Sequence, residues 1–199
     1  MHVEMRAIGS IEANCYIIDN HIMIDPGDSK TEIDCFLADT GANIDAVVIT
    51  HGHFDHMLGA AHIKKRYGAK IYISEADAPS LWKKEIALCL PYAVTPFEPI
   101  RPDALLSEGP ITLDGVPFEV MATPGHTPGS ICLISHSEKT VFTGDTLFRY
   151  GYGRTDLSGG DEFQLFHSLE RLLALPEDYY IYPGHGTGAL IGEIKKHWR

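Results

Sequence analysis

Three histidines and one aspartate lie within six residues of this chain, at His51, His53, Asp55 and His56. The apolar run 45–49 precedes them and predicts a buried strand, so these polar side chains follow a strand end. Side chains alternate along a strand, which places His51 and His53 on the same side, whereas Asp55 and His56 need a turning loop. Imidazole is the commonest metal ligand in proteins, and carboxylate is its usual partner. The stretch therefore predicts a metal site; a loop that is merely rich in histidine is the alternative.

Three later loops offer the same kinds of side chain. They carry His126, Asp145 and His185, and each has a glycine beside the polar residue, which allows a tight turn or close approach to a ligand. Apolar, strand-like runs precede them at 118–121, 140–142 and 179–182. Alone, His126 or His185 would be interpreted as an ordinary loop histidine. Together with the first cluster they give seven candidate ligands, more than one metal ion needs.

The periodicity of the chain predicts an α/β fold that presents these loops at strand ends. Strands are expected at 3–8, 14–24, 45–50, 69–74, 110–122, 130–135, 139–143 and 179–182. Asp114 and Gly115 give segment 110–122 the turn chemistry of a hairpin. Asp25 lies in a turn after the second strand, a position that its residue type favours.

Helices are expected at 30–40, 57–67, 75–90, 161–175 and 189–197. The first has Ile33, Phe36 and Leu37 on one face and Gly41 as its C-cap. The fourth begins after Asp161, which is its N-cap. The apolar face expected to be buried consists of Phe163, Phe166, Leu169, Leu172 and Leu173. Segment 75–109 could cover the site as a lid, frame a substrate groove or form a plain packed insertion.

Composition indicates one globular domain over residues 1–199, with 44% hydrophobic and 22% charged residues. The formal net charge of −11 argues against nucleic acid or an anionic membrane surface as a partner; a small-molecule partner is expected, and the oligomeric state stays open. Neither a signal core nor a membrane-spanning run of ~20 apolar residues is expected. The cysteines, without a Cys-x-x-Cys pair, indicate core thiols in a reducing compartment, so we expect a cytoplasmic location. They are Cys15, Cys35, Cys89 and Cys132.

The order His-x-His-x-Asp-His, then His, then Asp, then His resembles that of the metallo-β-lactamase superfamily. Further segments resemble its glyoxalase II-like branch: 14–16 (Asn-Cys-Tyr), 25–27 (Asp-Pro-Gly), 144–148 (Gly-Asp-Thr-Leu-Phe), 153–156 (Gly-Arg-Thr-Asp) and 184–186 (Gly-His-Gly). The resemblance extends from about residue 10 to about residue 193. It implies a four-layer αββα sandwich, which periodicity alone does not. It also implies that Asp25 lies close to the metals, so Asp25 is either a turn residue only or a hydrogen-bond partner of a ligand histidine.

The resemblance also implies how the seven candidate ligands divide between two divalent ions. The first ion is assigned to His51, His53 and His126, and the second to Asp55, His56 and His185, with Asp145 bridging them. Such a pair of ions shares a hydroxide that attacks a carbonyl carbon. Asp55 is also the catalytic candidate, because its carboxylate could accept a proton. Nitrogen and oxygen ligands suit Zn²⁺, and also Fe²⁺ or Mn²⁺.

The choice of substrate depends on the leaving group and on one cation. A thiol with a pKa of about 8.5 departs with little acid assistance, which favours thioester or ester substrates. The family has a basic residue that contacts glutathione at the position of Arg154, which implies a carboxylate contact here; a salt bridge with Asp156 is the alternative. Tyr92 and Phe97 are candidates for acyl-group contacts or for core.

Two departures from the family weaken glutathione specificity. The family tends to have tyrosines at the positions of Asp156 and Thr187. Its C-terminal glutathione-binding helical domain is not expected within residues 1–199.

These observations predict a binuclear metal-dependent hydrolase, a thioesterase of glyoxalase II type that acts on a hydroxyacylglutathione or a related small thioester. A mononuclear iron persulfide dioxygenase shares the motif and is the second hypothesis; its iron would bind His51, His126 and Asp145. A lactonase and a binding module that has lost activity are the remaining alternatives. The negative net charge argues against a nuclease activity like that of some members of the superfamily.

Overall fold

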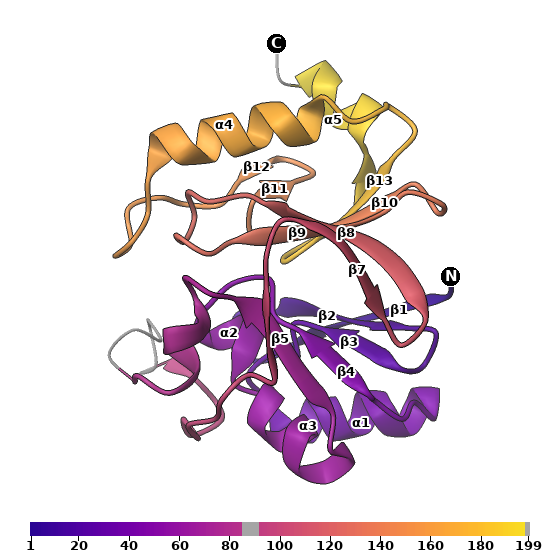
Figure 1. The fold of residues 1–199 in the computed structure, drawn as a ribbon, viewed down its shortest axis with the longest axis vertical. Coiled ribbons are helices and arrows are strands. Elements are labelled where there is room, and N and C mark those ends of the chain that lie inside the picture. Colours follow the sequence, from indigo (N-terminus) through magenta and orange to yellow (C-terminus); the bar gives the residue numbers. More distant parts are fainter. Residues whose placement is uncertain (85–91, 198–199) are drawn as a thin grey trace.

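The computed structural model describes residues 1–84 and 92–197 and arranges them in four layers (Figure 1). Two six-stranded sheets pack face to face in the middle. The outer face of one sheet is covered by α1 (Lys30–Thr40) and α3 (Ala60–Tyr67), and that of the other by α4 (Glu162–Leu173) and α5 (Ile191–His197). This is the αββα sandwich that the resemblance implied.

The first sheet consists, in spatial order, of β1 (Val3–Ile8), β2 (Ala13–Ile18), β3 (Ile22–Ile24), β4 (Ala46–Val48), β5 (Lys70–Ser74) and β6 (Ala104–Leu106). The first three strands are antiparallel, and β3 to β6 are parallel. The predicted strand 14–24 is therefore two strands, which turn at Asp19 and Asn20 with φ of 47° and 65°. β3 and β4 are buried on both faces, which explains why they are continuously apolar.

The second sheet consists, in spatial order, of β14 (Ala189–Leu190), β13 (Tyr180–Pro183), β10 (Thr140–Gly144), β9 (Ile131–Ser135), β8 (Val116–Ala122) and β7 (Gly109–Leu113). Only β10 and β13 are parallel among these neighbours. A small sheet of β11 (Leu147–Phe148) and β12 (Gly151–Tyr152) follows β10. Asp114 and Gly115 turn the β7–β8 hairpin with positive φ, as predicted.

Three apolar clusters fill the three spaces between the layers. One joins the first sheet to α1 and α3, one lies between the sheets, and one joins the second sheet to α4 and α5. Alternate residues of a strand belong to different clusters: Met23 packs toward the helices, whereas Ile22 and Ile24 pack toward the other sheet. The period of two along each strand thus sets the order of the layers.

The helices near the metal motif differ partly from the prediction. The buried face of α1 and its C-cap at Gly41, with φ 68°, are confirmed. The predicted helix 57–67 is instead a short α2 (Phe54–Met57) followed by α3. Gly59 separates them because it packs against the preceding loop: its N–H donates to the Gly27 carbonyl, and a Cβ at Gly59 would lie 2.7 Å from the Pro26 oxygen.

The predicted buried face of α4 is wrong in its first two turns. Phe163 is 90% exposed and Phe166 is also exposed, whereas Leu165 and Ser168 are buried with Leu169 and Leu172. The reason is tertiary: the Ser168 hydroxyl donates to the Pro124 carbonyl at 2.8 Å, so the small residue lets the helix rest on the loop that carries His126. The N-cap at Asp161 is confirmed.

Segment 75–90 was predicted as a helix, but its described part contains only turns and the 3₁₀ turn η1 (Ala78–Leu81). The rest of that prediction, with Cys89, lies outside the described residues. Cys15 and Cys132 are buried as expected, whereas Cys35 is exposed on α1, so its assignment to the core was wrong. Among the described helices, none has the length and apolar character needed to cross a membrane.

Phe142 tests the packing between the sheets. It is fully buried, stacks on Tyr182 with ring centroids 4.9 Å apart, and meets the edge of Tyr16. We expect Phe142→Ala to lower the free energy of unfolding by about 3–5 kcal/mol, because it leaves a cavity between two sheets. The matched control, Phe163→Ala on the exposed face of α4, should change it by less than about 0.5 kcal/mol. Urea denaturation measures both, and equal losses would contradict this account of the core.

Candidate metal centre

The loops that carry the predicted ligands all begin where a strand ends. β4 of the first sheet precedes the first cluster, and β8, β10 and β13 of the second sheet precede the other three loops. α2 carries two of the predicted ligands, Asp55 and His56, on its first turn. The structure brings all seven predicted side chains together: His51, His53, Asp55, His56, His126, Asp145 and His185.

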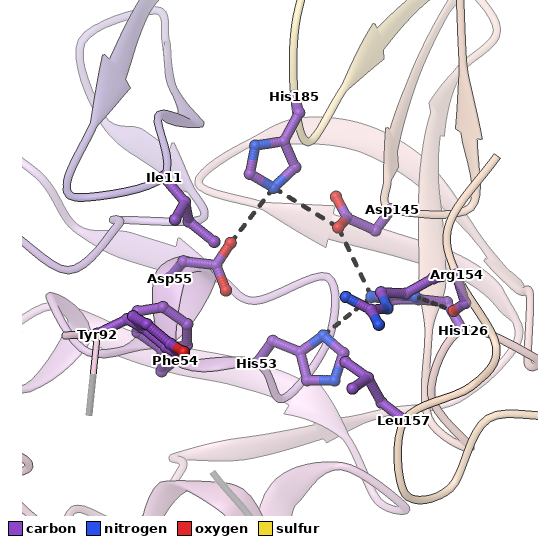
Figure 2. A pocket seen from close by; sticks show the side chains of 10 residues that line it. All are labelled: Ile11, His53, Phe54, Asp55, Tyr92, His126, Asp145, Arg154, Leu157 and His185. Atoms are coloured by element: carbon purple, nitrogen blue, oxygen red, sulfur yellow. Dashed lines mark hydrogen bonds and ion pairs between the residues drawn. The ribbon is translucent and has the colours of Figure 1, made fainter. Parts of the chain in front are cut away.

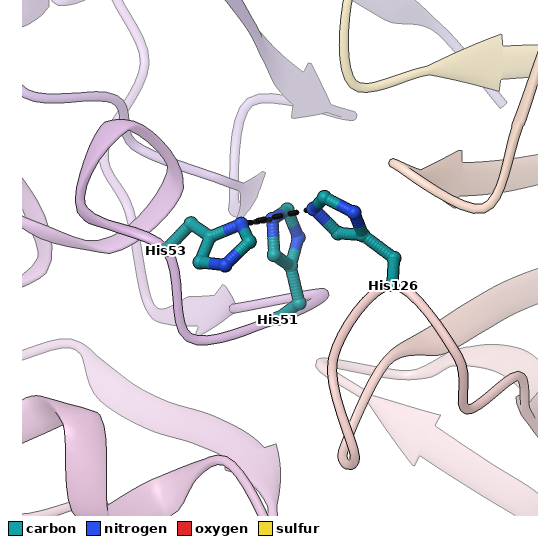
Figure 3. Close-up of side chains that lie close together, drawn as sticks. All are labelled: His51, His53 and His126. Carbon is teal, nitrogen blue, oxygen red and sulfur yellow. Dashed lines mark hydrogen bonds between the residues drawn. The ribbon is translucent and has the colours of Figure 1, made fainter. Parts of the chain in front are cut away.

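Three imidazoles form the first group. His53 Nδ1 lies 3.2 Å from His51 Nε2 and 2.9 Å from His126 Nε2 (Figure 3). Burial, reinforced by the neighbouring imidazoles, holds the pKa of His51 well below its ordinary value. Burial and His126 lower the pKa of His53 to about 3. His51 and His53 are therefore neutral at physiological pH and able to ligate a metal.

The far nitrogens of this group fix its tautomers. The Thr50 hydroxyl donates to Asp25 at 2.6 Å and therefore accepts from His51 Nδ1 at 3.1 Å. His126 Nδ1 donates to the Arg154 carbonyl at 2.7 Å. Both Nε2 atoms then present lone pairs toward His53 Nδ1, which can donate one proton at most, whereas a cation between the three nitrogens would bind a lone pair from each. Nitrogens on one tetrahedral Zn²⁺ with bonds of about 2.0–2.1 Å are about 3.3 Å apart, so the spacing fits a metal ion.

Carboxylates and two further imidazoles form the second group. Asp55 Oδ2 lies 3.1 Å from His56 Nε2 and 3.3 Å from His185 Nε2. Asp145 lies between the groups: its Oδ2 is 3.6 Å from both His126 Nε2 and His185 Nε2 (Figure 2). Its Oδ1 is 3.5 Å from His56 Nε2. A Cβ at Gly184 would come within 2.1 Å of Asp145 Oδ1, so this glycine is needed for the close approach of the loops.

Asp25 orients His56, as one of the two sequence interpretations proposed. Its Oδ2 accepts from His56 Nδ1 at 2.9 Å, and its Oδ1 accepts from the Thr50 N–H at 2.8 Å. His56 Nε2 and Asp145 Oδ1 are buried without a hydrogen-bond partner among the described residues. Burial disfavours a charged His56, but Asp55, Asp145 and Asp25 outweigh it and raise its pKa well above the ordinary value. This group therefore demands positive charge, and its oxygen and nitrogen donors fit a divalent metal ion.

Asp77 is a structural part of the site that the sequence did not reveal. Its buried carboxylate accepts from the N–H of Gly52 at 2.7 Å, from the N–H of Gly129 at 2.8 Å and from the Thr127 hydroxyl at 2.6 Å. Gly52 separates His51 from His53, and Thr127 and Gly129 follow His126, so one carboxylate joins two ligand loops. Burial raises the pKa of this carboxyl despite these donors. The signal was a carboxylate just after strand 70–74, which the predicted helix over 75–90 concealed.

A pocket of about 460 Å³ opens over the predicted ligands. Arg154 lines it, as expected, and also forms the alternative salt bridge: its Nε and Nη2 donate to Asp156 at 2.7 Å each. Tyr92 lines the pocket too. Phe97 packs against the core beneath the first sheet, which corrects the suggestion that it contacts an acyl group.

Known proteins resemble this chain in both sequence and architecture. The family model described as metallo-beta-lactamase superfamily matches residues 9–185. The hydroxyacylglutathione hydrolase GloC of Haemophilus influenzae is 34% identical over 98% of this chain and 96% of its own length. The BLEG-1 B3 metallo-beta-lactamase has a TM-score of 0.89 at 29% identity and covers 98% of this chain and 97% of its own. TTHA1623 in a di-iron-bound form has a TM-score of 0.87 at 33% identity, and the coverage is 97% of each chain.

The role of Asp77 can be measured by metal affinity. We expect Asp77→Asn to weaken zinc binding about tenfold, because an amide cannot accept from all three donors and the two ligand loops lose their common anchor. The control is Asp103→Asn, since Asp103 accepts from the Ile71 N–H and from Lys64, remote from the ligand loops. Competition with a chromogenic chelator gives the affinities. Equal affinities in the two variants would show that Asp77 only stabilises the fold.

Proposed function

Because the chain belongs to the metallo-beta-lactamase superfamily, we propose that it is a hydrolase that uses two divalent metal ions to cleave a thioester, in the manner of glyoxalase II. The position of Asp145 carries the proposal: its oxygens lie 3.6 Å from His126 Nε2 and 3.5 Å from His56 Nε2, so one carboxylate contacts both ligand groups. Similarity to a protein named hydroxyacylglutathione hydrolase and to a di-iron-bound structure supports it.

We assign the ligands as the resemblance implied. His51, His53 and His126 would hold the first ion, Asp55, His56 and His185 would hold the second, and Asp145 would contact both. When bound, such ions polarise a carbonyl oxygen and lower the pKa of a water molecule toward neutrality. Zn²⁺ is the proposed metal, and iron or manganese suits the same donors.

Asp55 is the proposed catalytic carboxylate. It lines the pocket, and although burial alone would raise its pKa, His56 and His185 outweigh burial and hold that pKa far below its ordinary value. Asp55 is therefore ionised. A carboxylate with so low a pKa is a weak general base, which favours a role as a metal ligand at the reacting centre. Asp25 and the Arg154 carbonyl keep His56 and His126 in the orientation that the reaction needs.

The proposed reaction consumes one water molecule. Its oxygen bonds to the acyl carbon, the carbon–sulfur bond breaks, and the products are a carboxylic acid and a thiol. The leaving thiol has a pKa of about 8.5, so the chain does not need a strong proton donor in the pocket. An amide would need one, which is why a thioester, or an ester, is the proposed substrate.

Arg154 is the proposed contact for an anionic group on the thiol side of the substrate. Its guanidinium lies at the edge of the pocket, where the hydrogen-bonded ion pair lowers the pKa of Asp156 to about 2. Exposed ion pairs contribute little to stability, so a substrate carboxylate can compete with Asp156 for the guanidinium.

A reducing compartment, and hence the cytoplasm, is the proposed location. Cys15 and Cys132 are buried as free thiols, and Cys35 is an exposed free thiol. Exposed thiols persist where glutathione and thioredoxin keep them reduced.

Metal content and turnover test the proposed function together. We expect two ions per chain, hydrolysis of lactoylglutathione, and loss of both turnover and at least one ion in Asp145→Ala. The control Asp178→Ala, which alters an exposed ion pair with Lys139, should retain both. Elemental analysis and thiol release measure these outcomes. One iron per chain with oxygen uptake on glutathione persulfide would indicate the dioxygenase instead, and cleavage of only a lactone or a β-lactam would refute the thioesterase.

Arg154 makes a separate kinetic prediction. Arg154→Ala should raise KM for an anionic thioester about three- to tenfold, with a smaller change in kcat, because the lost contact acts on binding. Arg149→Ala serves as the control, since Arg149 pairs with Glu193 and is not among the residues that line the pocket. An unchanged KM in Arg154→Ala would refute the substrate contact and leave the salt bridge with Asp156 as the role of Arg154.

A further inference from the structure

The two sides of the pocket differ in chemistry. Ile11, Phe54 and Tyr92 lie on one side of the predicted ligands, and Arg154 and Leu157 lie on the other (Figure 2). Ile11 is 47% exposed and Tyr92 is 70% exposed, so the rim on the first side presents large apolar surfaces to solvent. We call Ile11, Phe54 and Tyr92 the apolar wall. If a ligand group covered this wall, its binding free energy would become more favourable in proportion to the apolar area buried.

Asp28 holds the two loops of the apolar wall in place. This carboxylate is fully buried; its Oδ1 accepts from the Ser10 N–H at 3.3 Å, and its Oδ2 accepts from the Val94 N–H at 3.0 Å. Ser10 directly precedes Ile11, and Val94 follows Tyr92 by two residues. One buried carboxylate therefore ties the segments of Ile11 and Tyr92 together, although these two residues lie about eighty positions apart in the chain.

The apolar wall offers little to a polar acyl group. On this side, the polar side-chain groups among the described lining residues are the Tyr92 hydroxyl and the Asp55 carboxylate. Asp55 is already engaged by His56 and His185. A hydroxyl next to the reacting carbonyl, as in a lactoyl group, would leave its hydration shell mainly for carbon surface, which costs free energy.

We propose that the apolar wall binds the acyl group of the substrate, and that this group is aliphatic or aromatic rather than hydroxylated. The thiol side then extends toward Arg154 and Leu157, on the opposite side of the ligands. The substrate class is thus a thioester with an apolar acyl chain and an anionic thiol. This inference rests on the proposed function, since it specifies the substrate of the same site.

A series of S-acylglutathiones tests the acyl preference while the thiol stays constant. With the metal-loaded protein, kcat/KM should rise about fourfold for each CH₂ from acetyl to hexanoyl, as full burial of each methylene group predicts. The butanoyl compound should exceed the lactoyl compound. A value of kcat/KM that stays constant or falls along the series would overturn the inference.

Matched variants locate the effect. Ile11→Ser and Tyr92→Ser should flatten the rise of kcat/KM with chain length, so that the hexanoyl compound loses more of its kcat/KM than the acetyl compound does. The controls are Met5→Ser and Tyr150→Ser, because Met5 is 49% exposed, Tyr150 is 72% exposed, and neither lines the pocket. Both should keep the wild-type dependence on chain length. A wild-type dependence in Ile11→Ser and Tyr92→Ser would overturn the assignment of the wall.

Binding separates this inference from the proposed function. S-hexylglutathione, a thioether that cannot be hydrolysed, should bind at least tenfold more tightly than S-methylglutathione in calorimetry, and Tyr92→Ser should reduce the difference. If this preference appears but no acylglutathione is cleaved, the apolar wall stands and the thioesterase is refuted. If acylglutathiones are cleaved without any preference in rate or binding, the thioesterase stands and the wall is refuted.

Discussion

Seven side chains with lone pairs converge on one small volume, and their mutual repulsion is the constraint that the rest of the structure must satisfy. Ring nitrogens of the first group approach to 2.9 and 3.2 Å, and the second group adds two carboxylates. The groups respond in opposite ways: burial keeps His51 neutral, whereas the carboxylates draw positive charge to His56. The proposed pair of divalent cations would relieve both, because it would supply the positive charge that one group needs and would fill the space between the nitrogens of the other.

Hydrogen bonds from neutral donors hold these groups together, and they connect the half of the fold around the first sheet with the half around the second. Asp77 follows β5 of the first sheet and accepts from Gly129 in a loop of the second. Asn14 on β2 donates to the Pro183 and Gly186 carbonyls, and the Tyr16 hydroxyl donates to the Pro183 carbonyl at 2.6 Å, which anchors the loop of His185. Since the anchors belong to both sheets, the geometry of the site depends on the core packed between them.

Specificity is carried by loops rather than by the strand ends that hold the ligands. The segments around Ile11 and Tyr92 are tied to Asp28, just ahead of α1, and so they can differ in chemistry without moving a ligand. One site can therefore keep the same chemistry while its pocket selects among acyl groups. We propose that the apolar wall selects the acyl group and that Arg154 selects the thiol side of the substrate.

Much of the architecture was visible in the chain itself, because local rules determine it. The caps at Asp161 and Gly41, the hairpin at Asp114 and the buried strands follow from capping, turn chemistry and apolar periodicity. The seven candidate ligands were visible for a related reason: clustered imidazoles and carboxylates have few uses other than metal binding. The four layers came from the resemblance, since periodicity identifies a buried face without identifying what covers it.

Tertiary contacts decided the rest. The face of α4 turned toward Ser168 because a loop passes beneath it, and segment 75–84 forms turns around Asp77 instead of a helix because that carboxylate serves two distant loops. In the sequence, Asp28 and Asp77 look like ordinary surface acids. Only the fold shows which backbone N–H groups donate hydrogen bonds to their carboxylates. The physical reason is the same in each case: the type and spacing of residues record what a segment can do locally, whereas the partner of a buried polar group depends on what the rest of the chain brings to it.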